Sequence, residues 1–159
     1  MEVASPLAKG PLGDTGKKIP ALGLGLYYTP PGAATYDIVA EALKQGYRCV
    51  PHRSICIRCS TLRRSSLRGR HLDTAGFYEN EEDVGRAVRD SGIPREQIHI
   101  TSKVWPLEEG EWQTDGYKIV LEEVEKSFKK LGTYADLYLI HWPCNPGQRL
   151  NYWLALEVA

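Results

Sequence analysis

The sequence has little of several features that would assign a protein to a class at once. None of its apolar runs approaches the roughly 20 residues that span a bilayer, and the N-terminus holds no run of signal-peptide length. The 20 basic and 20 acidic side chains give a formal net charge of zero. A uniformly charged surface for nucleic acid is therefore not indicated. We expect a cytoplasmic protein that binds neither membrane nor nucleic acid.

Cysteine is also scarce, and its distribution is uneven. Three of the 4 cysteines, Cys49, Cys56 and Cys59, lie in residues 49–70, which is too clustered for a disulfide framework. The same segment holds six arginines and no acid, so the remainder has 14 basic residues (20 − 6) against 20 acidic ones. Its Ser- and Arg-rich sequence has neither the helical nor the strand period of its surroundings.

Three interpretations of residues 49–70 are open. A zinc or phosphate-binding module would use His52, Cys56 and Cys59, although a structural zinc ion usually takes four ligands. A solvated loop without function is the second. We favour a non-native insertion, because its removal joins Arg48 to His71 in one uninterrupted strand, GYRHLDTA. Arg48 and Arg70 are identical, so the join can lie one residue either way.

Strands and helices alternate along the rest of the chain. Alternation in units of roughly 30 residues is typical of parallel α/β architecture. An open doubly wound sheet and an eight-stranded barrel, which needs about 250 residues, both fit this pattern. The expected strands are residues 19–27, 98–105 and 137–142, and the expected helices are 34–45, a helix capped by Asn80, 117–131 and one beginning near residue 152. Gly46, Gly92 and Gly132 are the expected helix stops.

Three ionisable residues are expected at the ends of neighbouring strands. Lys103 shares one strand face with His99, Thr101 and Trp105, while Ile98, Ile100 and Val104 form the opposite, apolar face. Asp73 and His141 occupy corresponding places in their own strands. In a parallel barrel these ends meet at the active site. A structural ion pair and a buried core histidine are the non-catalytic alternatives.

Three ordered blocks resemble the aldo-keto reductase family. They are residues 73–85, with Asp-Thr-Ala followed by Tyr, Glu and Val-Gly, then ITSKVWP at 100–106 and LYLIHWP at 137–143. The resemblance covers residues 19 to about 143 outside the segment 49–70. It implies a (β/α)8 TIM barrel of which only about the first four βα units are present, with residues 1–159 as a partial barrel domain.

The resemblance also implies a catalytic set of Asp73, Tyr78, Lys103 and His141. Carbonyl reduction needs a hydride for carbon and a proton for the developing alkoxide. Tyr78 is the expected acid, and Lys103 the cation that favours its ionised form, since a phenol of pKa about 10 is otherwise a poor donor. Asp73 would hold Lys103, and His141 would orient the substrate carbonyl.

Substrate and cofactor residues follow from the same resemblance. We expect the substrate pocket to be lined by Tyr27, Trp105, Trp142 and His141. We expect the cofactor to lie against Leu26, Tyr27 and Asp73. NADPH is the expected cofactor, and NAD is possible. Leu26 stands where the family usually has Thr, so a backbone contact to the nicotinamide ribose is kept and a hydroxyl contact is lost. No GxGxxG fingerprint is present, Gly23-x-Gly25 being too short. No metal is expected.

The expected function is NAD(P)H-dependent reduction of aldehydes or ketones to alcohols. The family's remaining cofactor residues would all lie beyond Ala159, so we expect negligible activity from this chain alone. The alternative is a non-catalytic truncated remnant or regulatory module. The sequence indicates no oligomeric state.

Overall fold

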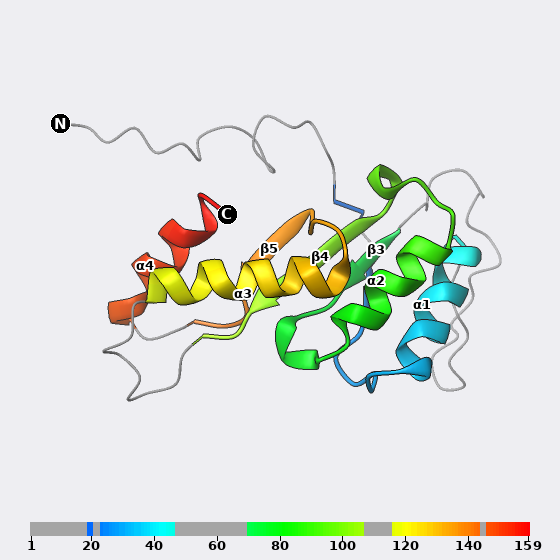
Figure 1. Cartoon of the computed structure of the whole chain (residues 1–159), viewed down its shortest axis with the longest axis horizontal. Helices are drawn as coiled ribbons and strands as arrows, with labels where there is room; N and C mark the ends of the chain where they lie inside the picture. The colour runs from blue at the N-terminus through cyan, green and yellow to red at the C-terminus, as the bar shows by residue number, and fades with distance from the viewer. Residues whose placement is uncertain (1–18, 21–22, 47–69, 107–115, 144–145) are drawn as a thin grey trace.

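The computed structural model describes residues 19–20, 23–46, 70–106, 116–143 and 146–159 (Figure 1). The expected insertion at 49–70 therefore lies outside the described residues except for Arg70, and with it lie His52, Cys56 and Cys59. Arg70 belongs to the sheet, because its carbonyl accepts a hydrogen bond of 2.7 Å from the His99 amide. No described helix is long and apolar enough to cross a membrane.

Four parallel strands form one sheet in chain order (Figure 1). They are β2 (Gly23–Gly25), β3 (His71–Asp73), β4 (His99–Val104) and β5 (Leu137–Ile140). Helices follow the strands: α1 (Ala33–Lys44), α2 (Glu81–Asp90), α3 (Gly116–Leu131) and α4 (Pro146–Leu156), with 3-10 turns η1 (Gly76–Tyr78) and η2 (Arg95–Gln97). The expected parallel α/β architecture is confirmed, and its four βα units are consistent with part of a TIM barrel.

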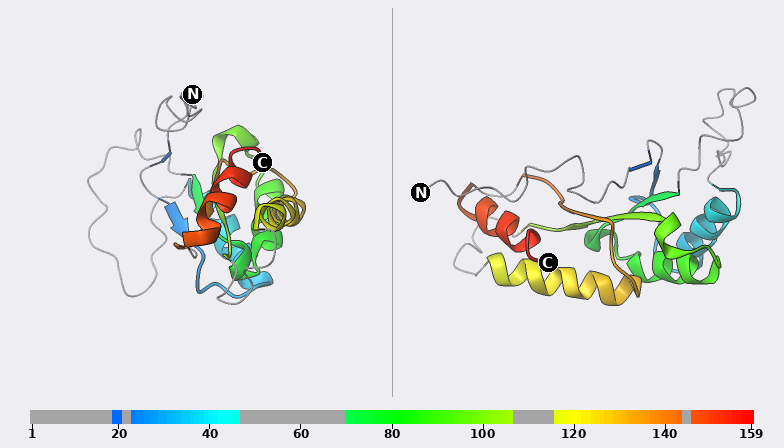
Figure 2. Two further views of the ribbon diagram at one scale, coloured as in Figure 1. Left: turned by 90° about the vertical axis from the view of Figure 1, so that its left-hand side faces the viewer. Right: turned by 90° about the horizontal axis from the view of Figure 1, so that it is seen from above.

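The helices α1, α2 and α3 lie on one side of the sheet (Figure 2). One apolar core joins α1 and α2 to β3 and β4, with Val39, Leu72, Val84 and Ile100 at its centre. A second core joins α3 and α4 to the end of β4. The apolar face of β4 points toward these helices, which leaves its polar face, with Lys103, on the opposite side of the sheet.

The polar face is packed closely near the amino ends of the strands. The His71 ring contacts the Thr101 hydroxyl at 2.9 Å and meets the His99 ring edge-on, with ring centres 4.8 Å apart. A Cβ at Gly23 would lie 2.7 Å from His71 Nδ1, so only glycine fits beside this ring. The absence of a side chain at Gly23 thus permits close approach by a side chain of the neighbouring strand.

Three local expectations were wrong. The first strand is shorter than residues 19–27 because Leu26 begins a turn, in which the Thr29 amide donates to the Leu26 carbonyl. Ile38, expected on the buried stripe of α1, is 41% exposed, and Thr35 is buried there instead. The last helix begins at Pro146 rather than near residue 152, since proline is well tolerated at the first helical position.

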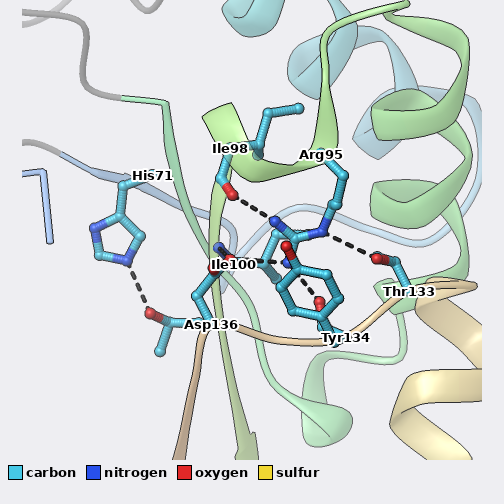
Figure 3. Close-up of polar contacts among 8 residues, drawn as sticks. His71, Arg95, Ile98, Ile100, Thr133, Tyr134 and Asp136 are labelled. Atoms are coloured by element: carbon cyan, nitrogen blue, oxygen red, sulfur yellow. Dashed lines mark hydrogen bonds and ion pairs between the residues drawn. The ribbon is translucent and has the colours of Figure 1, made fainter. Parts of the chain in front are cut away.

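Arg95 ties the amino ends of β4 and β5 together (Figure 3). Its guanidinium pairs with Asp136 at 2.8 Å and lies 3.9 Å from the centre of the Tyr134 ring. Asp136 in turn accepts a 3.0 Å hydrogen bond from the Ile100 amide in β4. The same guanidinium donates to the carbonyls of Ile98 and Tyr134 and to the Thr133 hydroxyl. This arrangement, called the Arg95 clamp below, fixes the sheet at the end opposite Lys103.

Candidate active site

Asp73 and Lys103 form an ion pair at the carboxyl ends of β3 and β4. Lys103 Nζ lies 2.5 Å from Asp73 Oδ1 and donates to the Thr74 carbonyl at 2.9 Å. In the sheet register Asp73 pairs with Thr101, so Lys103 stands two residues further along β4 and its side chain reaches back to the carboxylate. The Lys103 side chain is 12% exposed and the Asp73 side chain 36%. The pair therefore faces solvent at its carboxylate side.

Tyr78 and His141 complete a group around this pair. Tyr78 ends the 3-10 turn η1, which follows β3, and Lys103 Nζ lies 5.2 Å from its ring centre. His141 directly follows β5, and its amide donates to the Val104 carbonyl at 3.0 Å. The Tyr78 and His141 rings meet edge-on with centres 5.4 Å apart. The structure thus brings together the three residues expected at strand ends and Tyr78, the expected acid.

The surroundings of His141 favour its neutral form. Burial, and after it the positive charge of Lys103, lower the pKa of His141 below its ordinary value of 6.5, while Asp73 opposes this shift. Its Nδ1 is buried and has no hydrogen-bond partner among the described residues. A neutral imidazole donates from one ring nitrogen only, which suits it to orient a carbonyl oxygen.

Two tyrosines lie side by side here, and their environments differ. The Tyr27 and Tyr78 ring centres are 5.1 Å apart. A hydrogen bond with Tyr28, the largest cause, raises the pKa of Tyr27 above its ordinary value of 10.0. Lys103 lies next to the Tyr78 ring instead. The two rings therefore differ in their contacts: Tyr27 has a hydrogen bond that disfavours its ionised form, and Tyr78 has the Lys103 ammonium group beside its ring.

Aromatic side chains surround the four residues. Trp105 lies 4.9 Å from the His141 ring and 4.6 Å from Trp142, measured between ring centres. Phe77 stacks on Trp105 at 4.0 Å with an angle of 17° between the planes. Phe77 was not among the residues expected at the site. Its only signal in the sequence is that it is an aromatic residue next to Tyr78. Phe77, half-exposed, adds to the aromatic wall expected from Tyr27, Trp105 and Trp142.

A cavity of about 220 Å³ opens between the loop at residues 26–29, called the Tyr27 loop, and the turn η1. Its lining is aromatic and proline-rich, formed by Tyr27, Tyr28, Thr29, Pro30, Pro31, Phe77 and Tyr78. Tyr27 is 52% exposed and Tyr28 90%. The cavity reaches the candidate acid Tyr78 from the side of the loop that follows β2.

The expected backbone contact of Leu26 with a nicotinamide ribose stays a prediction. Its side chain is fully buried in the first core. Its amide donates to the Asp73 carbonyl at 3.0 Å, and its carbonyl accepts from Asn80 Nδ2 at 3.0 Å. The backbone atoms expected to meet a nicotinamide ribose are therefore already bonded within the chain. Among the described residues no group of three or more His, Cys, Asp or Glu side chains is placed to hold a metal ion.

Asn80 was expected as the cap of α2, and it does occupy the N-cap position. It precedes the helix, but its side chain makes no capping hydrogen bond. The amide is fully buried and turns toward the loop after β2, where it donates to the carbonyls of Leu26 and Thr29. Tertiary hydrogen bonds have replaced the local one, and Glu81, Glu82 and Asp83 in the first turn supply the charge that favours a helix N-terminus.

Candidate catalytic residues at the carboxyl ends of parallel strands are typical of a TIM-barrel type of enzyme site. The model of the Aldo/keto reductase family matches residues 31–159. A 9,11-endoperoxide prostaglandin H2 reductase of Trypanosoma cruzi is 37% identical over 88% of the chain and 40% of its own length. A glyoxal reductase of Bacillus subtilis is 36% identical over 89% of the chain and 41% of its own length.

Solved structures agree with these sequence matches. An aldo-keto reductase from a deep-sea metagenome library, MGS-M4, superposes with a TM-score of 0.65 at 36% identity, over 89% of this chain and 42% of that one. The aldose reductase of Schistosoma japonicum gives 0.65 at 28% identity, over 98% and 48%. The chain belongs to the aldo-keto reductase family. It spans about 40% or less of the length of the first curated relatives it matches.

Proposed function

We propose that this chain supplies the catalytic residues of an NADPH-dependent reductase that converts aldehydes or ketones to alcohols. The contact between Lys103 and Asp73 at 2.5 Å, beside Tyr78 and His141, is the observation that carries the proposal. Family membership supports the class of reaction, an oxidoreductase acting on a carbonyl. We propose NADPH as the cofactor, with NAD as the alternative, and a cytoplasmic location.

In the proposed reaction Tyr78 donates the proton to the carbonyl oxygen. The positive charge of Lys103, 5.2 Å from the Tyr78 ring centre, stabilises the negative charge left on the phenol oxygen. Asp73 and the Thr74 carbonyl hold the ammonium group in place. Neutral His141 donates a hydrogen bond to the same carbonyl oxygen and sets its orientation.

A nicotinamide cofactor, when bound, supplies the hydride. The described residues fit it in part. The Asp73 carboxylate is one-third exposed and the Tyr27 ring half-exposed, so both remain open to a ligand, whereas the amide and carbonyl of Leu26 are bonded internally. We therefore assign cofactor contacts on this chain to Tyr27 and Asp73, and the remaining contacts to the other half of a barrel.

The aromatic wall determines the proposed substrate class. Phe77, Trp105 and Trp142 stack or tilt against one another around His141. Such a wall binds a planar or apolar carbonyl compound better than a charged one, because apolar surface is removed from water on both partners. We propose aromatic aldehydes as the first substrates to assay.

The experiment supplies the chain with the rest of a barrel. Residues 1–159 are joined to the C-terminal half of the Bacillus subtilis glyoxal reductase, in one version as written and in a second without residues 49–70. NADPH oxidation is followed with 4-nitrobenzaldehyde, and NADH is compared. We expect turnover in the second version, loss of it on Tyr78→Phe, and little or none from residues 1–159 alone.

The outcomes separate the parts of the proposal. Turnover that survives Tyr78→Phe would remove Tyr78 as the acid. A folded fusion that binds NADPH but shows no turnover would favour the alternative of a non-catalytic module. Equal activity with and without residues 49–70 would contradict their proposed status as a non-native insertion, since that proposal expects them to interrupt the strand before Asp73.

A further inference from the structure

Asn80 forms a buried junction between the two loops that carry Tyr27 and Tyr78. Its side chain is fully buried. Nδ2 donates to the carbonyls of Leu26 and Thr29, both at 3.0 Å, and Oδ1 accepts from the Thr74 hydroxyl at 2.6 Å. Two of these partners lie 54 and 51 residues away in the sequence. One amide thus fixes both ends of the turn that contains Tyr27.

The junction continues to the catalytic lysine. Lys103 Nζ donates to the Thr74 carbonyl at 2.9 Å, and the Thr74 hydroxyl donates to Asn80. Hydrogen bonds therefore run without interruption from Lys103 through Thr74 and Asn80 to Leu26 and Thr29. Both loops and the lysine take their relative positions from this buried chain, because every polar group in it has a defined partner.

The Tyr27 loop has few other contacts to hold it. Tyr27 and Tyr28 are 52% and 90% exposed and pack mainly on each other and on Tyr78. Exposed rings do not fix a backbone by themselves. On the buried side the loop is held by the Leu26 side chain, the Leu26 amide and the two hydrogen bonds from Asn80. The buried Thr35 hydroxyl also lies 3.4 Å from the Thr29 carbonyl and donates to the Pro30 carbonyl at 2.7 Å.

We propose that Asn80 is a positioning residue that sets the distance between Tyr27 and Tyr78, and through it how tightly a carbonyl substrate is held beside the proton donor. The inference rests on the proposed reductase function. In this proposal Asn80 contacts neither the substrate nor the cofactor. It acts through the loop at 26–29, the edge of the 220 Å³ cavity.

Loss of the Asn80 donors has a specific kinetic consequence. The Leu26 carbonyl would keep only the Thr29 amide and the Thr29 carbonyl only the Thr35 hydroxyl at 3.4 Å, and the loop would open to reach water. The Asp73–Lys103 pair and the bond to the Thr74 carbonyl do not pass through the Asn80 side chain. We expect KM for 4-nitrobenzaldehyde to rise about 10-fold or more while kcat and its pH profile change little.

The test compares Asn80→Asp with Ser127→Ala. Asn80→Asp keeps the size of the side chain and removes both donors. Ser127→Ala removes a buried hydroxyl that contacts Tyr138 at 2.8 Å, away from the loop, and so matches the loss of a buried hydrogen bond. Hydrogen–deuterium exchange of the Thr29 and Gly32 amides is measured in residues 1–159, and kcat and KM in the fusion described above.

Faster exchange at Thr29 and Gly32 with a raised KM, in Asn80→Asp but not in Ser127→Ala, is the expected result. Unchanged exchange at these two amides overturns the proposal, whether or not the fusion is active. A fall in kcat with a shifted pH profile and an unchanged KM also overturns it, because Asn80 would then act on Lys103. The parent fusion could show no turnover while amide exchange at Thr29 and Gly32 is faster in Asn80→Asp alone. That result refutes the reductase function, but the role of Asn80 in holding the loop stands.

Discussion

Gly85 determines how closely α2 approaches the end of α3, and Gly85→Ala is expected to destabilise the fold. A Cβ at this position would lie 2.0 Å from the Leu131 carbonyl oxygen and 2.5 Å from its carbonyl carbon. Ordinary contact begins at roughly 3.5 Å, so the helices would have to separate by about 1.5 Å. Leu131 is fully buried and belongs to the first core, so the shift would disturb that core.

Two effects of opposite sign decide the magnitude. Alanine in a helix interior gains about 1 kcal/mol over glycine. Overpacking of a core costs about 1 to 3 kcal/mol, and the upper end applies here because the obstacle is backbone rather than a flexible side chain. The net expectation is a loss of about 2 kcal/mol, or roughly 4 to 8 °C in Tm for a domain of this size.

Urea and thermal unfolding followed by circular dichroism measure the effect, with Gly25→Ala as the matched control. A Cβ at Gly25 would meet no atom within 4 Å. The same chemical change there is expected to leave stability unchanged or to raise it by up to about 1 kcal/mol. A Gly85→Ala chain as stable as its parent would refute the packing argument, since helix propensity would then have outweighed the overlap.

Three further outcomes are expected. Lys103→Met should lower kcat/KM of the fusion by about 100-fold or more without changing its fold, because the charge beside Tyr78 is lost; an effect on KM alone would contradict this. Because the pKa of His141 is lowered in the folded chain, the unfolded chain binds more protons just below pH 6.5. The free energy of unfolding should therefore fall as pH drops from 6.5, and it should fall less in His141→Gln. Urea unfolding across this pH range can check this. Arg95→Ala should lower the free energy of unfolding by about 3 kcal/mol, measured in the same way, because the buried Asp136 carboxylate keeps the Ile100 amide but loses its ion-pair partner, and a cost below about 1 kcal/mol would show that water replaces the guanidinium.

Much of the fold could be predicted because its signals are local. Gly46, Gly92 and Gly132 were expected to end helices, and all three have positive φ, at 61°, 64° and 64°. The alternation of strand and helix, and the placement of Lys103 and Asp73 at strand ends, follow from periodicity within single elements. Neighbouring parallel strands then bring such ends together whatever the detailed packing.

The part that could not be predicted depends on contacts between distant segments. Asn80 before a helix has the local signal of a cap, yet its partners Leu26 and Thr29 lie more than 50 residues earlier. Phe77, in the turn after β3, stacks on Trp105, which follows β4. The Thr74 side chain, which bonds Asn80, stood inside a motif without any signal of its own role.

The Arg95 clamp and the candidate catalytic residues lie at opposite ends of the same strands. The clamp is largely covered, with side chains 17% and 7% exposed, so its strength should depend little on salt. Loops at the far end can therefore change sequence without loosening the sheet that supports them. A library varied at residues 27–31 and 105–106, with 95 and 136 kept, is a practical route to new carbonyl substrates on this scaffold.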